Sequence, residues 1–246
     1  MRAPERAPTP DELIAGARRL LEQGEIQVRG RMPWASNATL LVDVALAGDS
    51  ARAIYKPGRG ERPLWDYPAG LYRREVAVAV IDGLLGWDLV PPTVQRDGPF
   101  GPGSVQLFVP SVDDEHYFTL VERPEHHGSL RAICAFDLLV NNGDRKGGHC
   151  LLGLDGRVRA IDHGLCLHAD PKLRTVVWDF AGQPVPAPLL ADVERVFASD
   201  EPLPSPLDEL LDDTERSALV RRARALVDHP AFPPLRSARS FPWPLV

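Results

Sequence analysis

The segment at residues 141–164 constrains the fold of this chain most strongly, because its spacing predicts a short β-hairpin with polar side chains at one end. It reads NNGDRKGGHCLLGLDGRVRAIDHG. Asp155-Gly156 is the strongest short-range signal for a hairpin turn, and apolar residues flank it on both sides. A two-residue turn there pairs Leu154 with Arg157 and, further along the ladder, His149 with Asp162.

Three polar side chains are expected at the open end of this hairpin. Cross-strand neighbours have Cβ atoms roughly 4.5–5.5 Å apart, which lets His149 and Asp162 hold one metal ion. Asp144 lies in the polar, glycine-containing loop that enters the hairpin, so it reaches the same end. This pattern predicts a small site with one histidine and two carboxylates.

A structural zinc site is the alternative interpretation of the same region. It uses the histidines and cysteines of the hairpin and the residues after it: His149, Cys150, His163, Cys166 and His168. The chain has no Cys-x-x-Cys pair, and alternate residues of a strand point to opposite faces. These observations favour the site formed by Asp144, His149 and Asp162 over zinc.

The rest of the chain alternates between strand-like and helical stretches. The sequence Thr9-Pro10-Asp11-Glu12 has the pattern of a helix N-terminal capping box, and Gly24 can end that helix. Strand-like stretches lie at 26–28, 39–46, 52–55, 93–95 and 104–109, and helical spacing is found at 71–85, beyond Ser129, at 189–197 and at 214–227. The first 110 residues therefore predict a five-stranded sheet with one inserted helix.

Composition narrows the class of protein. The chain has 246 residues, a formal net charge of −6, 44% hydrophobic and 25% charged residues, as in ordinary soluble globular proteins. It has no apolar run of membrane-spanning length and no apolar signal-peptide core near Met1, so a cytoplasmic location is expected. The acidic balance, without a basic run, argues against a nucleic-acid partner. The three cysteines are expected to be buried thiols.

In several short motifs the chain resembles protein-kinase-like enzymes. The stretch from Gly143 to His149, the hairpin, and then Ile161-Asp162-His163-Gly164 resemble their catalytic loop and metal-binding Asp-x-Gly motif. The branch closest in pattern is the phosphoinositide 3- and 4-kinase-like group, and more narrowly a family of small actinobacterial proteins of that kind. The shared motifs are Tyr55-Lys56-Pro57, Leu64-Trp65-Asp66, Tyr72 to Val76, Asp144 to His149 and Trp178 to Gly182.

The resemblance implies a role for each catalytic residue. Lys56 would place its charge on the nucleotide phosphates, and Glu75 on the following helix would hold that lysine. Asp144 would orient the acceptor hydroxyl and accept its proton, while Asp162 and His149 would carry the metal ion, Mg²⁺ or Mn²⁺. Related kinases have asparagine where His149 stands, so the metal preference is open.

The resemblance also implies a nucleotide site. Ser36 and Asn37, in the turn between the first two strands, would cover the phosphates of ATP with backbone N–H groups. The segment Gln106 to Val109 (Gln106, Leu107, Phe108, Val109) would connect the lobes and offer backbone groups to adenine. Ile54 and Ile161 would form apolar walls around the base.

Two further segments have open interpretations. Asp137 lies on the apolar helix before the catalytic loop and is expected either as an exposed carboxylate or as an acceptor for N–H groups of the loop. Trp178 to Gly182 lies where kinases keep an activation or substrate loop, and core packing of Trp178 and Phe180 is equally compatible with the sequence.

Together these observations predict an α+β fold with two lobes, like that of protein kinases. An N-terminal helix with a short flexible start occupies residues 1–24, an antiparallel-sheet lobe residues 25–110, and a mainly helical lobe residues 111–246. The expected function is ATP- and divalent-metal-dependent transfer of a phosphoryl group to a hydroxyl of a lipid or inositol headgroup, another small molecule or a protein. The alternatives are a nucleotide-binding pseudokinase and an enzyme that transfers AMP.

Overall fold

The computed structural model describes residues 9–33, 37–199, 202–235 and 237–246, and they group into two compact units. The first unit takes the described residues up to Arg62 together with Pro92–Phe108, and the second takes Pro63–Pro91 and the described residues from Val109 onward. The helix at 71–85, which the sequence boundaries place in the N-terminal lobe, groups with the second unit. The lobe boundaries themselves stay a prediction.

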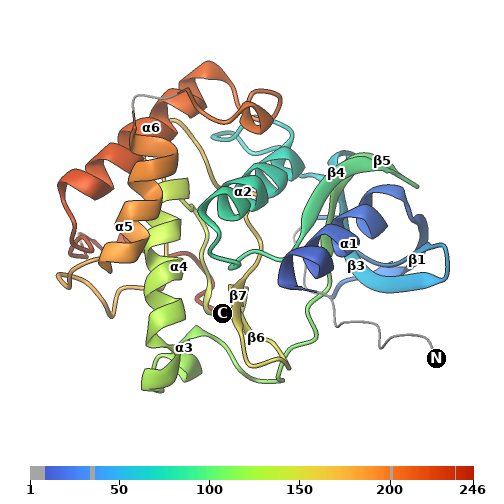
Figure 1. The fold of residues 1–246 in the computed structure, drawn as a ribbon, viewed down its shortest axis with the longest axis horizontal. Helices are drawn as coiled ribbons and strands as arrows, with labels where there is room; N and C mark the ends of the chain where they lie inside the picture. The colour runs from blue at the N-terminus through green and yellow to red at the C-terminus, as the bar shows by residue number, and fades with distance from the viewer. Residues whose placement is uncertain (1–8, 34–36, 200–201, 236) are drawn as a thin grey trace, which may run out of the picture. The chain divides into compact units, whose positions relative to one another are not determined.

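The first unit is a five-stranded antiparallel sheet with one helix packed on it. The five strands that the sequence predicts are present, and the sheet has the order β1-β2-β3-β5-β4 (Figure 1). Its strands are β1 (Glu25–Arg31), β2 (Leu40–Leu46), β3 (Asp49–Pro57), β4 (Thr93–Gly98) and β5 (Gly101–Leu107).

The capping box predicted at the start of the first helix is confirmed. Helix α1 (Pro10–Gln23) begins after Thr9, whose N–H donates to the Glu12 carboxylate at 2.8 Å while its hydroxyl accepts the Glu12 N–H at 3.3 Å. Leu21 on α1 joins Val42, Tyr55 and other strand residues in the apolar core of this unit. The helix therefore covers one face of the sheet and leaves the other face outside this core.

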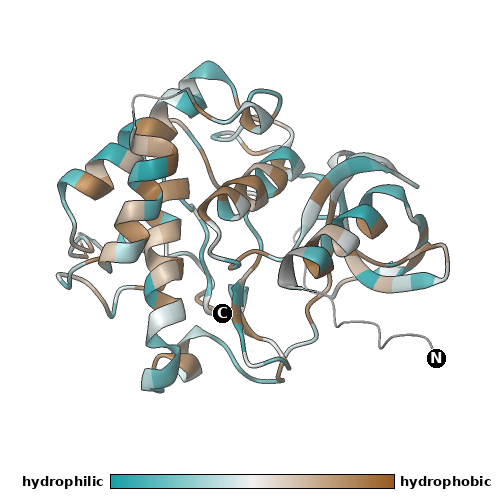
Figure 2. Ribbon diagram, in the orientation of Figure 1, coloured by the Kyte–Doolittle hydropathy of each residue, from teal (hydrophilic) through white to brown (hydrophobic). Residues whose placement is uncertain are grey.

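The second unit holds the larger apolar core. Helices α2 (Leu71–Leu85), α4 (His127–Val140) and α6 (Asp213–Asp228) contribute most of its helical core residues, and Figure 2 shows α2 and much of α4 in the colours of hydrophobic residues. The other elements are η1 (Gly58–Gly60, in the first unit), α3 (Tyr117–Leu120), η2 (Pro124–His126), η3 (Gly147–His149), β6 (Cys150–Leu152), β7 (Val158–Ala160), α5 (Ala187–Val193), η4 (Glu194–Ala198), η5 (Ser205–Leu207) and η6 (Ala238–Ser240).

This core tests the expectation about the cysteines. Cys134, Cys150 and Cys166 are all buried free thiols, as predicted. Burial raises the pKa of the Cys150 thiol to about 12, so it stays protonated and unreactive at neutral pH. Within the part of the chain that the structure describes, no helix has the length and apolarity that crossing a membrane requires.

Candidate active site

The predicted register of the hairpin is wrong by one residue. Strands β6 and β7 pair Cys150 with Ala160, and the Gly153 N–H donates to the Arg157 carbonyl at 2.9 Å. The loop therefore has three residues and ends on Gly156, whose φ of 78° is the left-handed conformation of a glycine bulge. His149 pairs through its backbone with Ile161, which donates its N–H to the His149 carbonyl at 3.0 Å, and not with Asp162.

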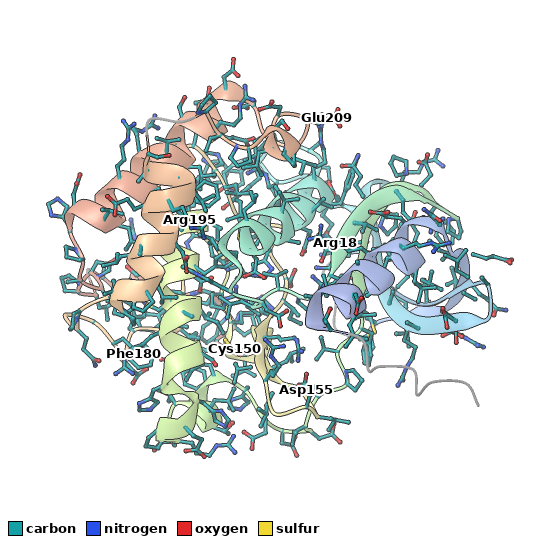
Figure 3. The ribbon with its side chains drawn as sticks, in the orientation of Figure 1. Arg18, Cys150, Asp155, Phe180, Arg195 and Glu209 are labelled. Atoms are coloured by element: carbon teal, nitrogen blue, oxygen red, sulfur yellow. The ribbon has the colours of Figure 1, made fainter. Side chains whose placement is uncertain are left out.

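The side chains of His149 and Asp162 nevertheless meet. The His149 Nε2 lies 3.3 Å from the Asp162 Oδ2. Asp162 has a φ of 60°, the left-handed conformation, so the chain turns after Ile161 and does not continue the strand. Asp155, which Figure 3 labels, lies at the tip of the hairpin. The turn at Asp162 brings its carboxylate to His149 at the opposite end.

Asp144 is held at this end by the catalytic loop. Its N–H donates to the Asn142 Oδ1 at 2.9 Å, and its carboxylate lies 3.0 Å from the Lys146 Nζ. Burial raises the pKa of the Asp144 carboxyl, the Lys146 ammonium opposes that shift, and the negative charge of Asp162 adds to it. Asp162 therefore lies close enough to influence the protonation of Asp144.

The geometry of His149 and Asp162 fits a metal ion. The His149 Nδ1 lies 3.0 Å from the Asp144 carbonyl oxygen and 3.4 Å from the Lys146 backbone nitrogen. In the tautomer that carries its proton on Nδ1 and donates to the Asp144 carbonyl, the Nε2 lone pair faces Asp162. In the described part of the chain, no group of three or more His, Cys, Asp or Glu side chains is placed to hold a metal, so the structure does not bring together the ligands that the zinc alternative needs. Two protein ligands, completed by phosphate oxygens and water, are typical of Mg²⁺ sites in kinases.

The buried pair of Asp137 and Arg145 lies beneath these residues. Both side chains are shielded from solvent, and the Arg145 Nη2 and Nε lie 3.0 and 3.1 Å from the Asp137 Oδ1. Asn142 donates its side-chain amide to the same carboxylate at 2.9 Å. Burial lowers the pKa of the Arg145 guanidinium, but Asp137 outweighs burial and keeps the pKa above its ordinary value. Asp137 is thus a buried acceptor for the catalytic loop, not an exposed carboxylate.

Arg145 also bonds to the backbone on both sides of the hairpin. Its Nη1 donates to the Ile161 carbonyl at 2.8 Å and lies 3.3 Å from the His149 carbonyl. Its Nη2 lies 2.8 Å from the His163 Nε2. A single guanidinium therefore contacts the residues before and after Asp162.

Glu75 contacts the same turn from helix α2. It is buried, and its Oε2 accepts the His163 N–H at 3.1 Å. Arg145 on one side and Glu75 on the other thus fix the peptide groups that flank Asp162. Because a left-handed aspartate is disfavoured by about 1–3 kcal/mol, such bonds are needed to hold it.

The predicted phosphate-binding lysine lies in the first unit. Lys56 and Ile54 occupy alternate positions of β3, opposite Ser104 and Gln106 of β5. Ala53 and Tyr55 point into the core with α1, so Ile54 and Lys56 share the other face of the sheet. The pairing of Lys56 with Glu75 stays a prediction.

The predicted phosphate-covering turn is only partly described. Ser36 lies outside the described residues. The Asn37 Oδ1 accepts the Arg62 N–H at 3.0 Å, and the N–H groups of Ala38 and Thr39 donate to the carbonyls of Gly60 and Asn37 at 3.1 and 2.8 Å. Those two N–H groups are used inside the protein, so they do not support the assignment of this turn to phosphate.

The predicted adenine connector begins inside a strand. Gln106 and Leu107 belong to β5, and the Gln106 side chain donates to the Thr93 hydroxyl at 2.8 Å. The N–H groups of Leu107 and Phe108 donate to the carbonyls of Pro92 and Arg52. These two N–H groups are therefore not available to a base, which leaves carbonyl groups and Val109 for that role.

The structure also shows the surroundings of Ile161, the second predicted apolar wall, and of the aromatic residues that follow Asp162. Ile161 is half-buried at the site. Phe180 is a core residue that packs against Phe232 and lies under the Arg131 guanidinium, whereas Trp178 is half-buried against Phe241. Core packing is confirmed for Phe180.

A family model described as phosphatidylinositol 3- and 4-kinase matches residues 93–219, just over half of the chain. This chain belongs to that family. It is also 40% identical over 260 residues to Protein Rv2133c of Mycobacterium tuberculosis (strain ATCC 25618 / H37Rv), covering 92% of this chain and 94% of the relative. The predicted resemblance to small actinobacterial members of the family is confirmed.

Solved structures support the fold. The Golgi casein kinase is similar with a TM-score of 0.59 at 15% identity, over 90% of this chain and 76% of that one. The Helicobacter pylori proinflammatory kinase CtkA is similar with a TM-score of 0.49 at 14% identity, over 86% of this chain and 94% of that one. The similarity to the Golgi casein kinase confirms the two-lobed α+β fold of protein-kinase-like enzymes, and the family and fold are those of a kinase-type enzyme.

Sequence reasoning missed the role of Arg145. Arginine is rarely buried, so its place after Asp144 gave no sign of burial. The usable signal was Asp137 on an apolar helix face, because a buried carboxylate needs a cationic or hydrogen-bonding partner nearby.

Proposed function

We propose that this protein is an ATP- and divalent-metal-dependent phosphotransferase that acts on a hydroxyl acceptor. The observation that carries the proposal is the convergence of Asp144, His149 and Asp162 at one end of the β6–β7 hairpin, with Asp162 held in a left-handed turn by Arg145 and Glu75. Phosphoryl transfer depends mainly on positioning and charge neutralisation, and this set provides both.

Each residue has a distinct part in the proposed reaction. His149 Nε2 and Asp162 would hold Mg²⁺ or Mn²⁺, which when bound neutralises charge on the nucleotide phosphates. Lys56 would bind those phosphates from the face of the first sheet that it shares with Ile54. Asp144 accepts a hydrogen bond from the acceptor hydroxyl, orients it and takes its proton late in the transfer. The Lys146 ammonium opposes the rise that burial causes in the pKa of Asp144 and so favours its ionised form.

A thermal-shift series with ATP tests this proposal most directly. ATP with Mg²⁺ or Mn²⁺ at 100 times its dissociation constant should stabilise the protein by about 2.7 kcal/mol, and ATP with a chelator should stabilise it much less. Asp162→Ala is the matched variant, because it removes a metal ligand that is half exposed and leaves the core unchanged. A shift that is the same with and without metal contradicts the metal-dependent site.

Two alternatives remain on the same fold. A pseudokinase binds nucleotide without turnover, whereas an AMP-transferring enzyme moves the α-phosphorus. ATP labelled separately at the α- and γ-phosphorus distinguishes all three, because only the proposed activity moves the γ-label to an acceptor or to water.

His149→Asn tests the metal preference. Nitrogen ligation favours Mn²⁺ over Mg²⁺ relative to a site with oxygen ligands alone, so the asparagine variant should retain activity and shift its preference toward Mg²⁺. The measurement is the ratio of kcat/KM with the two metals. An unchanged ratio in both His149→Asn and His149→Ala means that His149 does not bind the metal.

A further inference from the structure

Trp65 stands at the tip of a tight turn in the second unit. Leu64 and Tyr67 form an isolated antiparallel bridge, so Trp65 and Asp66 occupy the two central positions of the turn. Trp65 is 95% exposed, more than any other large hydrophobic side chain in the described part of the chain. We call residues 64–67 the Trp65 turn. Neither the nucleotide site nor the proposed catalytic site uses it.

The Trp65 turn is fixed against the catalytic loop. The Leu165 carbonyl accepts both the Gly143 N–H at 2.8 Å and the Tyr67 hydroxyl at 3.2 Å. A Cβ atom at Gly143 would lie 2.5 Å from the Tyr67 hydroxyl, so the two segments are in close contact. Asp144 follows Gly143 directly, and the turn therefore lies beside the acceptor position.

The turn is held in one conformation by charge as well. The Asp66 carboxylate lies 3.1 Å from the Lys172 Nζ, and both side chains are mostly buried. The same ammonium lies 5.8 Å from the ring centres of Trp65 and Tyr67. A large apolar side chain is thus exposed on a turn that the Asp66–Lys172 pair and the Tyr67 hydroxyl bond hold against the second unit.

Arg174 adds a positive charge beside the same loop. Its N–H donates to the Asn142 carbonyl at 2.8 Å, and its carbonyl accepts the Arg145 N–H at 3.0 Å, so its backbone runs alongside the catalytic loop. Its side chain is exposed and forms no ion pair within the described residues. Lys146 and Lys172 are paired with Asp144 and Asp66, which makes Arg174 the cation available to a ligand here.

The shape of this surface favours a protein as the ligand. Small molecules bind in concave sites that cover most of their surface, and an indole that is 95% exposed at the tip of a turn lines no such site. An anionic membrane is recognised by clusters of roughly four to eight basic residues, whereas this surface offers one unpaired arginine. Trp, Tyr and Arg together are the residues most enriched in protein-binding hot spots.

We propose that the Trp65 turn and Arg174 dock a protein acceptor, with an apolar side chain of the acceptor on the indole and an acidic one at the guanidinium. This proposal rests on the proposed function. In the step it serves, an acceptor hydroxyl oxygen forms a bond to the γ-phosphorus of ATP and its proton passes to Asp144. The bond from that phosphorus to the β–γ bridging oxygen breaks, and ADP leaves with the electron pair.

The test uses two synthetic peptide libraries with γ-labelled ATP. Both contain a fixed Ser, Thr or Tyr and flanking apolar residues, and one carries acidic and the other basic residues. The acidic library is expected to be phosphorylated better. Trp65→Ala should raise KM for it about tenfold or more, with a smaller effect on kcat. Arg174→Glu should reverse the preference between the two libraries.

Matched controls come from the same unit. Leu154→Ala changes another exposed apolar side chain, at the far tip of the hairpin, and Arg221→Glu reverses an exposed charge on α6. Both should leave KM and the library preference unchanged. Equal effects of the test and control variants overturn the proposal.

Other acceptors are tested in parallel. Transfer of the γ-phosphate to water, glycerol or inositol but to neither library, or binding to vesicles of phosphatidylcholine and phosphatidylserine that Trp65→Ala weakens, overturns the protein acceptor while the phosphotransferase stands. Absence of any nucleotide-dependent thermal shift and of any γ-phosphate transfer instead overturns the proposed function itself.

Discussion

Asp144→Asn is expected to lower kcat for phosphoryl transfer by about 10³-fold while leaving the dissociation constant of ATP within a few-fold of the wild-type value. The amide has the same shape as the carboxylate and keeps the backbone bond from Asp144 to Asn142, but it cannot accept the proton of the acceptor. Single-turnover kinetics and ATP titration measure the two quantities separately. Loss of nucleotide binding together with loss of fold would make Asp144 a structural turn residue instead.

The pH dependence of kcat provides a second check on Asp144. The base acts only when it is ionised, so activity falls as the pH drops through its pKa, which burial raises above the ordinary value of an aspartate. Lys146 lowers that pKa, and Lys146→Met should therefore move the acid limb of the profile to higher pH. Arg221→Met is the control, because Arg221 lies on α6, and it should leave the limb in place. If the acid limb stays at the same pH in Lys146→Met, the group that titrates is not Asp144.

The elements of the fold could be predicted because their signals are local. The capping box at Thr9 and the helix at 71–85 follow from caps and spacing within a few residues. The hairpin register could not be predicted, since Asp155-Gly156 fits both a two-residue turn and a three-residue loop that ends on a glycine bulge. The pairing of β6 with β7 distinguishes the two loop types, and this pairing depends on tertiary contacts.

The sequence predicted the solvent-accessible residues of the candidate site but not the buried residues that hold them in place. Asp144, His149 and Asp162 are polar residues near a turn signal, and a local pattern is enough to bring them together. Their support comes from Asp137, ahead of the catalytic loop, and from Glu75, far from it in sequence. Glu75 accepts the His163 N–H, a bond that the sequence did not indicate, and its pairing with Lys56, which the resemblance implies, stays a prediction. Long-range bonds of this kind leave no periodic trace in a sequence.

Arg145→Met is expected to destabilise the protein by about 3–5 kcal/mol, because it leaves the Asp137 carboxylate buried without its cation. Urea denaturation measures the loss. The double variant Asp137→Leu/Arg145→Met removes both charges and should recover most of that stability, since apolar residues of similar size replace a buried ion pair at little cost.

The recovered double variant then isolates what Arg145 does for Asp162. It lacks the bonds to the Ile161 carbonyl and the His163 ring, so the left-handed turn at Asp162 is held by Glu75 alone among these partners. Affinity for Mn²⁺ in the presence of ATP should fall about 10–100-fold, and the His163 amide should exchange its hydrogen faster. The buried pair Arg74–Glu215 supplies the control, because the Arg74 guanidinium donates to the Cys166 carbonyl and not to the peptide groups that flank Asp162. Arg74→Met/Glu215→Leu removes an ion pair of the same kind and should leave Mn²⁺ affinity unchanged. A double variant at 137 and 145 that is stable and binds Mn²⁺ normally would restrict Arg145 to a role in folding.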